Sequence, residues 1–204
     1  YGDTTNTNRL DLEFRWVYQN STVGSLVSVR DEFGQNDQWL SIEAVHVIGS
    51  NQNDNLRLSV GNDVAGVENG NGYMDGWSGN DLLFGNAGND TFRPGSGKDT
   101  IDGGEGWDHV DLGEDSNDLR DLGRYGVFVE LANKMATDSW GFTDLLVSIE
   151  SVSGSQYNDE LLGDEFRNWL GGQAGDDLLD GKEGDDSLEG HDGNDTMYGG
   201  MGND

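Results

Sequence analysis

The chain has 204 residues, 33% of them apolar, and its 40 acidic and 11 basic side chains give a formal net charge of −29. Low hydrophobicity combined with high net charge is typical of chains that do not fold unaided. The sequence has no Lys and Arg cluster for binding nucleic acid, no apolar run long enough to span a membrane, and no cysteine for a disulfide or thiolate metal site. No signal peptide is recognisable, and we expect the chain to be part of a longer polypeptide.

Residues 1–48 are predicted to form a β-rich lead-in or capping segment. Apolar side chains alternate with mostly charged ones from Leu10 to Tyr18, which is typical of a half-buried strand. Residues 112–153 are predicted to be a second linker or capping segment with strands. There Val127, Val129 and Leu131 repeat the alternation.

Between these segments, at 49–111, a unit of nine residues repeats. Its clearest copies begin at Gly76 and read GWSGNDLLF, GNAGNDTFR, PGSGKDTID and GGEGWDHVD. Each copy has Gly at position 4, Asp at position 6 and a large apolar residue at position 8. The earlier copies are less regular, and one has Gly72 at position 6.

The same unit returns at 154–204. Its clearest copies begin at Gly172 and read GQAGDDLLD, GKEGDDSLE and GHDGNDTMY, followed by an incomplete GGMGND. Asn168 replaces aspartate at position 6 of an earlier copy. The residues before the two blocks, Ser41–Val45 and Ser148–Val152, also resemble each other. The pattern therefore indicates a duplicated unit of lead-in followed by array.

The nine-residue spacing predicts a coiled architecture. Positions 7 to 9 are read as a short strand that points position 8 inward, and the glycine-rich positions 1 to 6 reverse the chain. Two units, or eighteen residues, bring the chain back above its start. The expected all-β fold is a flattened coil with two short parallel sheets and two rows of turns.

This coil stacks the position-6 carboxylates. Because stacked strands lie about 4.8 Å apart, two bare carboxylates on neighbouring coils repel by about 3 to 4 kcal/mol at an effective dielectric constant of about 20. Calcium fits such a column, since it accepts carboxylate and carbonyl oxygens in loose geometry, whereas magnesium needs stricter geometry and zinc prefers His or Cys. Sites are predicted between Asp63 and Asp81, Asp81 and Asp99, Asp90 and Asp108, Asp159 and Asp177, Asp177 and Asp195, and Asp186 and Asp204, with a weaker site between Asn168 and Asp186. Asp54 and Asp90 have no partner at Gly72, so that edge is expected to be empty.

These repeats resemble the RTX (repeats-in-toxin) or haemolysin-type calcium-binding family, most clearly over 76–111 and 172–204. The resemblance implies a parallel β-roll that binds several calcium ions. It further implies export by the type I secretion system of a Gram-negative bacterium, with the chain unfolded at low cytosolic calcium and folded outside the cell. The implied partners are calcium, the rest of the parent polypeptide and the secretion machinery.

A second hypothesis is an adhesin or ligand-binding segment of a large surface protein. Trp77, Trp107 and Trp169 fall outside the inward position 8, and aromatic side chains stack on sugars or protein partners. The simpler interpretation, which we favour, is that these tryptophans cap the roll or pack against the lead-in strands. Whether the chain binds a glycan or a cell-surface partner is left open at this point.

An enzyme is the third hypothesis, and we expect no catalysis from this segment. The sequence lacks H-E-x-x-H, G-x-S-x-G and P-loop motifs, and His46, His109 and His191 are isolated from one another. Asp176–Asp177 and Asp185–Asp186 resemble glycosidase dyads, but each is interpreted as a solvated turn residue followed by a calcium ligand. RTX arrays occur in toxins, proteases, lipases, epimerases and adhesins, and the repeats do not distinguish these parents.

Overall fold

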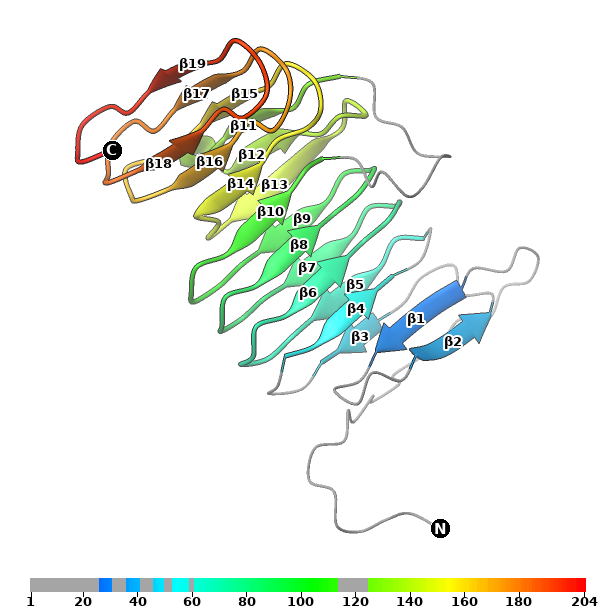
Figure 1. Cartoon of the computed structure of the whole chain (residues 1–204). Coiled ribbons are helices and arrows are strands. Elements are labelled where there is room, and N and C mark those ends of the chain that lie inside the picture. The colour runs from blue at the N-terminus through cyan, green and yellow to red at the C-terminus, as the bar shows by residue number, and fades with distance from the viewer. Residues whose placement is uncertain (1–25, 31–35, 41–45, 50–52, 59–60, 114–124) are drawn as a thin grey trace, which may run out of the picture.

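The computed structural model describes residues 26–30, 36–40, 46–49, 53–58, 61–113 and 125–204 (Figure 1). Regular structure in these residues is β-strand apart from one 3-10 turn, η1 (Leu131–Asn133). The strand predicted from Leu10 to Tyr18 lies outside the described residues.

The strands form two sheets that face each other across the roll. In order, the first sheet contains β18 (Ser187–Glu189), β16 (Trp169–Gly171), β14 (Ser151–Ser153), β10 (His109–Asp111), β8 (Thr91–Arg93), β6 (Tyr73–Asp75), β4 (Asn55–Arg57), β1 (Leu26–Arg30) and β2 (Asn36–Leu40). The second contains β19 (Thr196–Tyr198), β17 (Leu178–Asp180), β15 (Glu160–Leu162), β11 (Phe128–Glu130), β12 (Met135–Thr137), β13 (Thr143–Val147), β9 (Thr100–Asp102), β7 (Leu82–Phe84), β5 (Val64–Gly66) and β3 (His46–Ile48).

Within both arrays, neighbouring strands are parallel and eighteen residues apart. Leu83 pairs with Ile101 in the first array, and Leu161 pairs with Leu179 in the second. Consecutive repeats therefore alternate between the two sheets, and each eighteen-residue coil stacks on the one before it. The predicted parallel β-roll is confirmed.

The apolar residues at position 8 form the core. Leu83, Phe92, Ile101, Val110, Leu161, Leu170 and Leu179 have no exposed surface. Burying a side chain of this size stabilises the fold by about 1.5 to 3 kcal/mol. Leu188 is only partly buried and Met197 is 50% exposed, because β18 and β19 are the edge strands of the two sheets.

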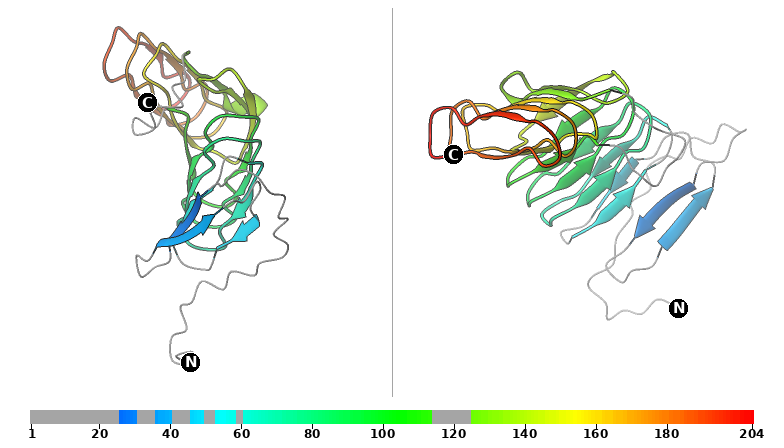
Figure 2. Two further views of the ribbon diagram at one scale, coloured as in Figure 1. Left: turned by 90° about the vertical axis from the view of Figure 1, so that its right-hand side faces the viewer. Right: turned by 45° about the horizontal axis from the view of Figure 1, so that its top comes forward.

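The two arrays belong to one roll. β14 pairs in parallel with β10, so the first sheet runs unbroken from one array into the other. In the second sheet, β9 pairs in parallel with β13, which is followed by the antiparallel strands β12 and β11 before β15 resumes the parallel order. Figure 2 shows in two views that the roll bends at the insert formed by β11, β12 and β13. The boundaries of the four predicted segments stay a prediction.

The strand predicted around Val127, Val129 and Leu131 is confirmed as β11 and the start of η1, and all three side chains are buried. At the other end of the first sheet, β1 pairs antiparallel with both β2 and β4. The first sheet therefore ends in an antiparallel pair of strands, with β2 as its edge strand.

The core position gives a matched pair for a stability test, because Leu82 and Leu83 are adjacent in β7 but point to opposite faces. Leu83 is fully buried and Leu82 is 40% exposed. We expect Leu83→Ala to lower the free energy of unfolding in calcium by about 2 to 5 kcal/mol. Leu82→Ala should cost less than about 1 kcal/mol. Urea denaturation measures both, and equal losses would contradict the assignment of position 8 to the core.

Candidate metal centres

The residue at position 6 directly precedes a strand, so these residues form one column beside each sheet. Asp81 Oδ1 accepts the backbone N–H of Asp63 at 2.8 Å, and Asp99 Oδ1 accepts that of Asp81 at 2.8 Å, each across eighteen residues. The same bond joins Gly72 to Asp90, Asp90 to Asp108, Asp159 to Asp177, Asn168 to Asp186, Asp177 to Asp195 and Asp186 to Asp204. Every predicted pair is therefore brought together, although cation binding at each pair stays a prediction.

The second oxygen of these carboxylates is unusual. Within the described residues, Oδ2 is buried and has no hydrogen-bond partner at Asp81, Asp90, Asp99, Asp108, Asp177 and Asp186. A buried carboxylate oxygen without a partner is costly in a metal-free protein. The column therefore offers a row of unused hard oxygen ligands.

Glycine at position 1 keeps the space open beside five of these six oxygens, whereas Pro94 takes that position in the repeat of Asp99. A methyl group on Gly76 would lie 2.6 Å from Asp81 Oδ2 and would also collide with the carbonyl oxygen of Pro94 in the next coil. A methyl group on Gly181 would collide with Asp186 Oδ2 and lie 2.6 Å from the Gly199 carbonyl oxygen. A carboxylate oxygen and a backbone carbonyl of the next coil thus border the same small space.

A second ladder is made by position 5, which is Asn or Asp in most repeats. Asn62 Oδ1 accepts the N–H of Asn80 at 2.8 Å, and Asn80 Oδ1 accepts that of Lys98 at 2.9 Å. Asp176 does the same for Asn194 at 2.9 Å. These side chains are exposed and bond to the following coil, whereas the position-6 side chains bond to the preceding one. Asp176 is solvated as predicted, and its role in holding coils together was missed, although the recurrence of Asn at position 5 signals it.

Two residues of the insert continue the position-6 columns. Asp144 Oδ1 accepts the N–H of Asp99 at 2.9 Å, and Glu150 Oε2 accepts that of Asp108 at 2.8 Å. Both were missed, because they lie outside the clear repeats. A signal exists for Asp144, since SWGFTDLLV at 139–147 carries aspartate and leucine at positions 6 and 8.

The family comparison agrees with this geometry. The family model for the RTX calcium-binding nonapeptide repeat matches four times, at 67–92, 85–119, 153–188 and 171–204, which together span slightly more than half of the chain. The chain belongs to the RTX calcium-binding repeat family. A search of curated proteins found no match. No helix in the described residues is long and apolar enough to cross a membrane.

The residues of this RTX module fit calcium. Among the described residues, no three acidic or histidine side chains converge into a ready-made metal site. The spaces beside Asp81, Asp90, Asp108, Asp177 and Asp186 instead combine a backbone carbonyl with an Oδ2 that has no partner among the described residues. Calcium takes carboxylate and carbonyl oxygens together, so it suits this mixed set better than zinc does. The position-6 residues would hold the ion, and the ion would supply positive charge to the column.

Burial raises the pKa of carboxyl groups in the columns when no metal is bound. It raises the pKa of Asp81 to about 8 and that of Asp99 to about 7, partly offset by the N–H bonds from the preceding coil. Burial likewise raises the pKa of Asp108 to about 6. Neighbouring carboxylates add to all three increases. Without a cation, Asp81 and Asp99 therefore tend to hold protons near neutral pH.

Two position-6 residues of the second array differ from the others. Ser155 donates its N–H to Asp159 Oδ2 at 2.6 Å and its hydroxyl to Asp159 Oδ1 at 2.7 Å. Asn168 Oδ1 accepts the N–H of Asp164 in its own turn at 2.9 Å. Both side chains have internal partners, so we expect the sites at this end of the second array to be the weaker ones.

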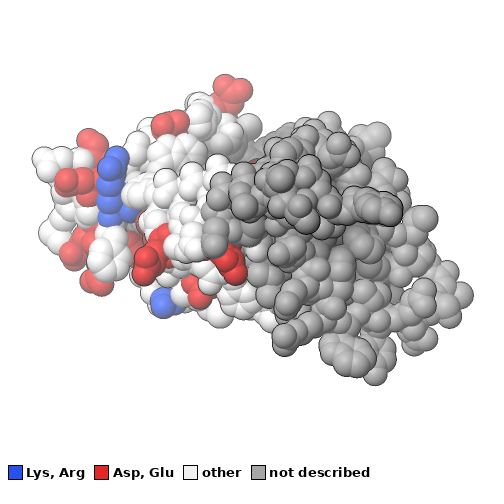
Figure 3. All heavy atoms as spheres, turned by 90° about the horizontal axis from the view of Figure 1, so that it is seen from below, with Lys and Arg blue, Asp and Glu red and all other residues white. Residues whose placement is uncertain are grey.

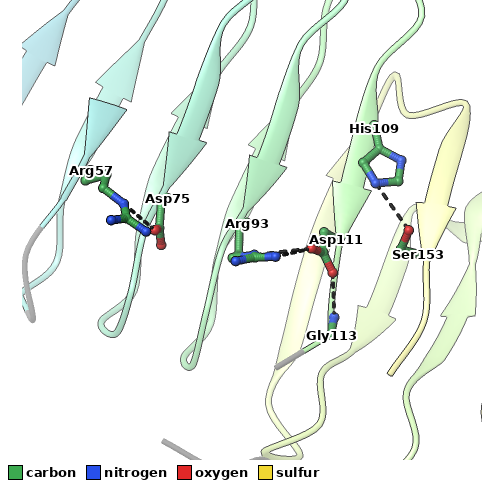
Figure 4. Close-up of polar contacts among 7 residues, drawn as sticks. All are labelled: Arg57, Asp75, Arg93, His109, Asp111, Gly113 and Ser153. Carbon is green, nitrogen blue, oxygen red and sulfur yellow. Dashed lines mark hydrogen bonds and ion pairs between the residues drawn. The ribbon is translucent and has the colours of Figure 1, made fainter. Parts of the chain in front are cut away.

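The outer face of the first sheet carries polar contacts between neighbouring strands. Arg57 Nε lies 3.1 Å from Asp75 Oδ2 and Arg93 Nε lies 3.2 Å from Asp111 Oδ2, one coil apart (Figure 4). His109 contacts Ser151 Oγ at 2.7 Å through Nδ1 and Ser153 Oγ at 3.3 Å through Nε2. Burial lowers the pKa of His109. Both ring nitrogens are thus used in holding β10 against β14.

Two of the three singled-out tryptophans have internal partners. The guanidinium of Arg167 lies 5.3 Å from the Trp107 ring centroid, and the Trp169 ring lies 5.9 Å from that of His109. Both contacts cross the place where the two arrays meet. Trp77 is 39% exposed in its turn.

The raised pKa values predict opposite pH dependences with and without calcium. The folded metal-free roll binds more protons than the unfolded chain, so its stability should fall as pH rises from about 4 toward about 8. Calcium must displace those protons, so its affinity should rise with pH over the upper part of this range. We expect about tenfold per pH unit for a site that releases one proton.

Circular dichroism in chelator as the pH is raised from about 4, and calcium titrations at several pH values, measure these two trends. Proton release on binding can be checked in buffers of different ionisation enthalpy. Stability and affinity that do not vary with pH would contradict the burial of ionisable ligands.

Proposed function

We propose that this RTX segment is a calcium-responsive folding module of a secreted protein. It stays loose at low cytosolic calcium, leaves the cell through a type I secretion system, and folds in the calcium-rich exterior. The observation that carries the proposal is the row of buried position-6 carboxylates whose Oδ2 atoms have no partner among the described residues.

The high negative charge of the chain also supports calcium-dependent folding. The net charge of −29 opposes compaction. Asp and Glu outnumber Lys and Arg on the described part of the face in Figure 3. Ions that bind only the folded roll would relieve this repulsion and stabilise it by mass action. A protein with this balance would be extended in one compartment and compact in another, which is what export followed by folding requires.

Far-ultraviolet circular dichroism tests this proposal directly. We expect a largely disordered spectrum in EGTA and a β-rich spectrum in millimolar calcium, with cooperative dependence on calcium concentration. Magnesium at equal concentration is the control and should have much less effect. A β-rich spectrum that is the same in EGTA and calcium would contradict the proposal.

A pair of Asp→Asn variants tests whether single aspartates are shared between neighbouring calcium sites. Asp81 bonds to Asp63 on one side and to Asp99 on the other, so it borders two predicted sites, whereas Asp63 borders one. Asparagine keeps Oδ1 as an acceptor and removes the charge. Asp81→Asn should therefore raise the calcium midpoint more than Asp63→Asn does, and equal shifts would argue against ligands shared between sites.

We propose binding to a glycan or surface partner as a second candidate function, favoured by the exposure of Trp77. Trp107 and Trp169 have internal ring partners, which leaves Trp77 as the aromatic residue of the three that is best placed to stack on a sugar. Binding of the calcium-loaded chain to a glycan array should then be lost in Trp77→Ala and kept in Trp107→Ala. An array without hits would count against this function. We propose no catalysis by this segment, since His109 is bonded to two serines.

A further inference from the structure

The repeat at 67–75 departs from the regular pattern at two positions at once. It has Val67 at position 1 and Gly72 at position 6, where the regular repeats have glycine and aspartate. The repeats at 58–66 and 94–102 also replace the glycine at position 1, but both keep the aspartate at position 6. In 67–75 the carboxylate is therefore lost and an apolar side chain is gained in the same turn.

These two changes are sterically linked. A methyl group on Gly72 would lie 2.6 Å from Val67 Cγ1 and 2.7 Å from Val67 Cγ2, so no side chain fits at position 6 while Val67 is in place. In a regular repeat the relation is reversed, since a methyl group on Gly76 would lie 2.6 Å from Asp81 Oδ2. Positions 1 and 6 thus share one space. The carboxylate of Asp81 borders it with an oxygen, whereas the fully buried Val67 fills it with methyl groups.

Val67 also closes the corresponding space of the preceding coil. A methyl group on Gly49 would lie 2.5 Å from Asp54 Oδ2 and 3.3 Å from Val67 Cγ1, at a place where the regular coils have a backbone carbonyl oxygen. The carbonyl oxygen of Val67 itself accepts the side-chain N–H of Asn86 at 2.5 Å. The space beside Asp54 is therefore bordered by a methyl group, and the position-1 carbonyl of the next coil already has a partner.

The backbone stacking is nevertheless regular here. The N–H of Tyr73 donates to the Asp54 carbonyl oxygen at 2.8 Å, and the N–H of Thr91 donates to the Gly72 carbonyl oxygen at 2.9 Å. The N–H of Gly72 donates to Asp90 Oδ1 at 2.6 Å. β4, β6 and β8 therefore stack through the same bonds as the later strands, with an apolar group in place of one carboxylate.

We propose that Val67 replaces a cation at this place, so that these coils stack without calcium and the calcium-dependent stacking of the roll begins from them. This inference rests on the proposed calcium-dependent function. Calcium needs oxygen ligands, and a methyl group supplies none. Because Gly72 is uncharged, Asp54 and Asp90 are neighbours two coils apart, and their repulsion is about half that of adjacent carboxylates. Burial of Val67 stabilises the stack at any calcium concentration, and folding of a solenoid can propagate from one stable part.

The double variant Val67→Gly with Gly72→Asp tests the replacement by restoring the regular pattern. We expect it to bind at least one calcium ion more than the wild-type chain in equilibrium dialysis. The single variants are the controls. Gly72→Asp leaves no room for the new side chain, and Val67→Gly adds no carboxylate, so neither should gain an ion. A double variant with the wild-type ion count would contradict the replacement.

Hydrogen exchange during a calcium titration tests where stacking begins. The amides of Tyr73 and Thr91 should become protected at lower calcium concentration than those of Leu178 and Thr196, which make the equivalent bonds in the second array. The difference should shrink in the double variant, whose first coils need an ion. Protection of all four amides at the same calcium concentration in the wild-type chain would show that stacking does not begin at Val67.

Anomalous diffraction from wild-type crystals soaked in terbium decides the question independently of any variant. Density beside Asp81 and Asp90, with none between Asp54 and Val67, supports the replacement. If ions lie in the regular coils and also between Asp54 and Val67, this inference is wrong and the calcium-dependent function stands. If the wild-type chain binds no ion at all, both are wrong.

Discussion

Repulsion between carboxylates stacked one coil apart is the constraint on which the rest of this structure depends. The parallel β-roll places position 6 of every second repeat in one column, because the coil length is fixed at eighteen residues by the register of the strands. At six of the position-6 aspartates, Oδ1 accepts an N–H of the preceding coil, while Oδ2 is buried and has no partner among the described residues. Burial then raises the pKa of groups such as Asp81 and Asp99. The fold therefore needs protons or cations to neutralise its columns, which ties its stability to the surrounding solution.

Other interactions do not depend on ions, and they specify the shape. The residues at position 8 fill the core, and the amides and carboxylates at position 5 bond one coil to the next from the solvent side. In a solenoid each coil contacts mainly its neighbours, so stability adds up coil by coil. The core and position-5 contacts therefore set the order in which the coils stack. The charged columns decide in which solution conditions the stacked roll is stable. Because packing specifies the shape and the charged columns set its stability, one sequence can encode a definite structure whose stability still depends on the protons and cations around it.

The sequence was most informative where a single period governs both local structure and packing. Gly at position 4, Asp at position 6 and an apolar residue at position 8 were enough to predict the strands, the core and the eighteen-residue neighbours. The pairing of β13 and β14 with the first array escaped this reasoning because it spans 45 and 42 residues, as for Ile101 with Leu146 and Val110 with Val152. Asp144 and Glu150 enter the columns through those distant pairings, and the repeat-like spacing around Asp144 does not show which coil it will meet.

The insert also bears on how the two arrays cooperate. Their first sheet is continuous, so the backbone bonds between β10 and β14 join them directly. Their second sheet is interrupted by two antiparallel pairings, and the column beside it stops at Asp144 and restarts at Asp159, which bonds to the uncharged Val127. The other column extends from Asp108 to Glu150, and Asn168 meets Glu150 through its Nδ2, which lies 3.5 Å from the Glu150 carbonyl oxygen. Closing a junction between distant residues costs more chain entropy than adding a local coil. Folding that begins within either array is therefore expected to reach the junction last.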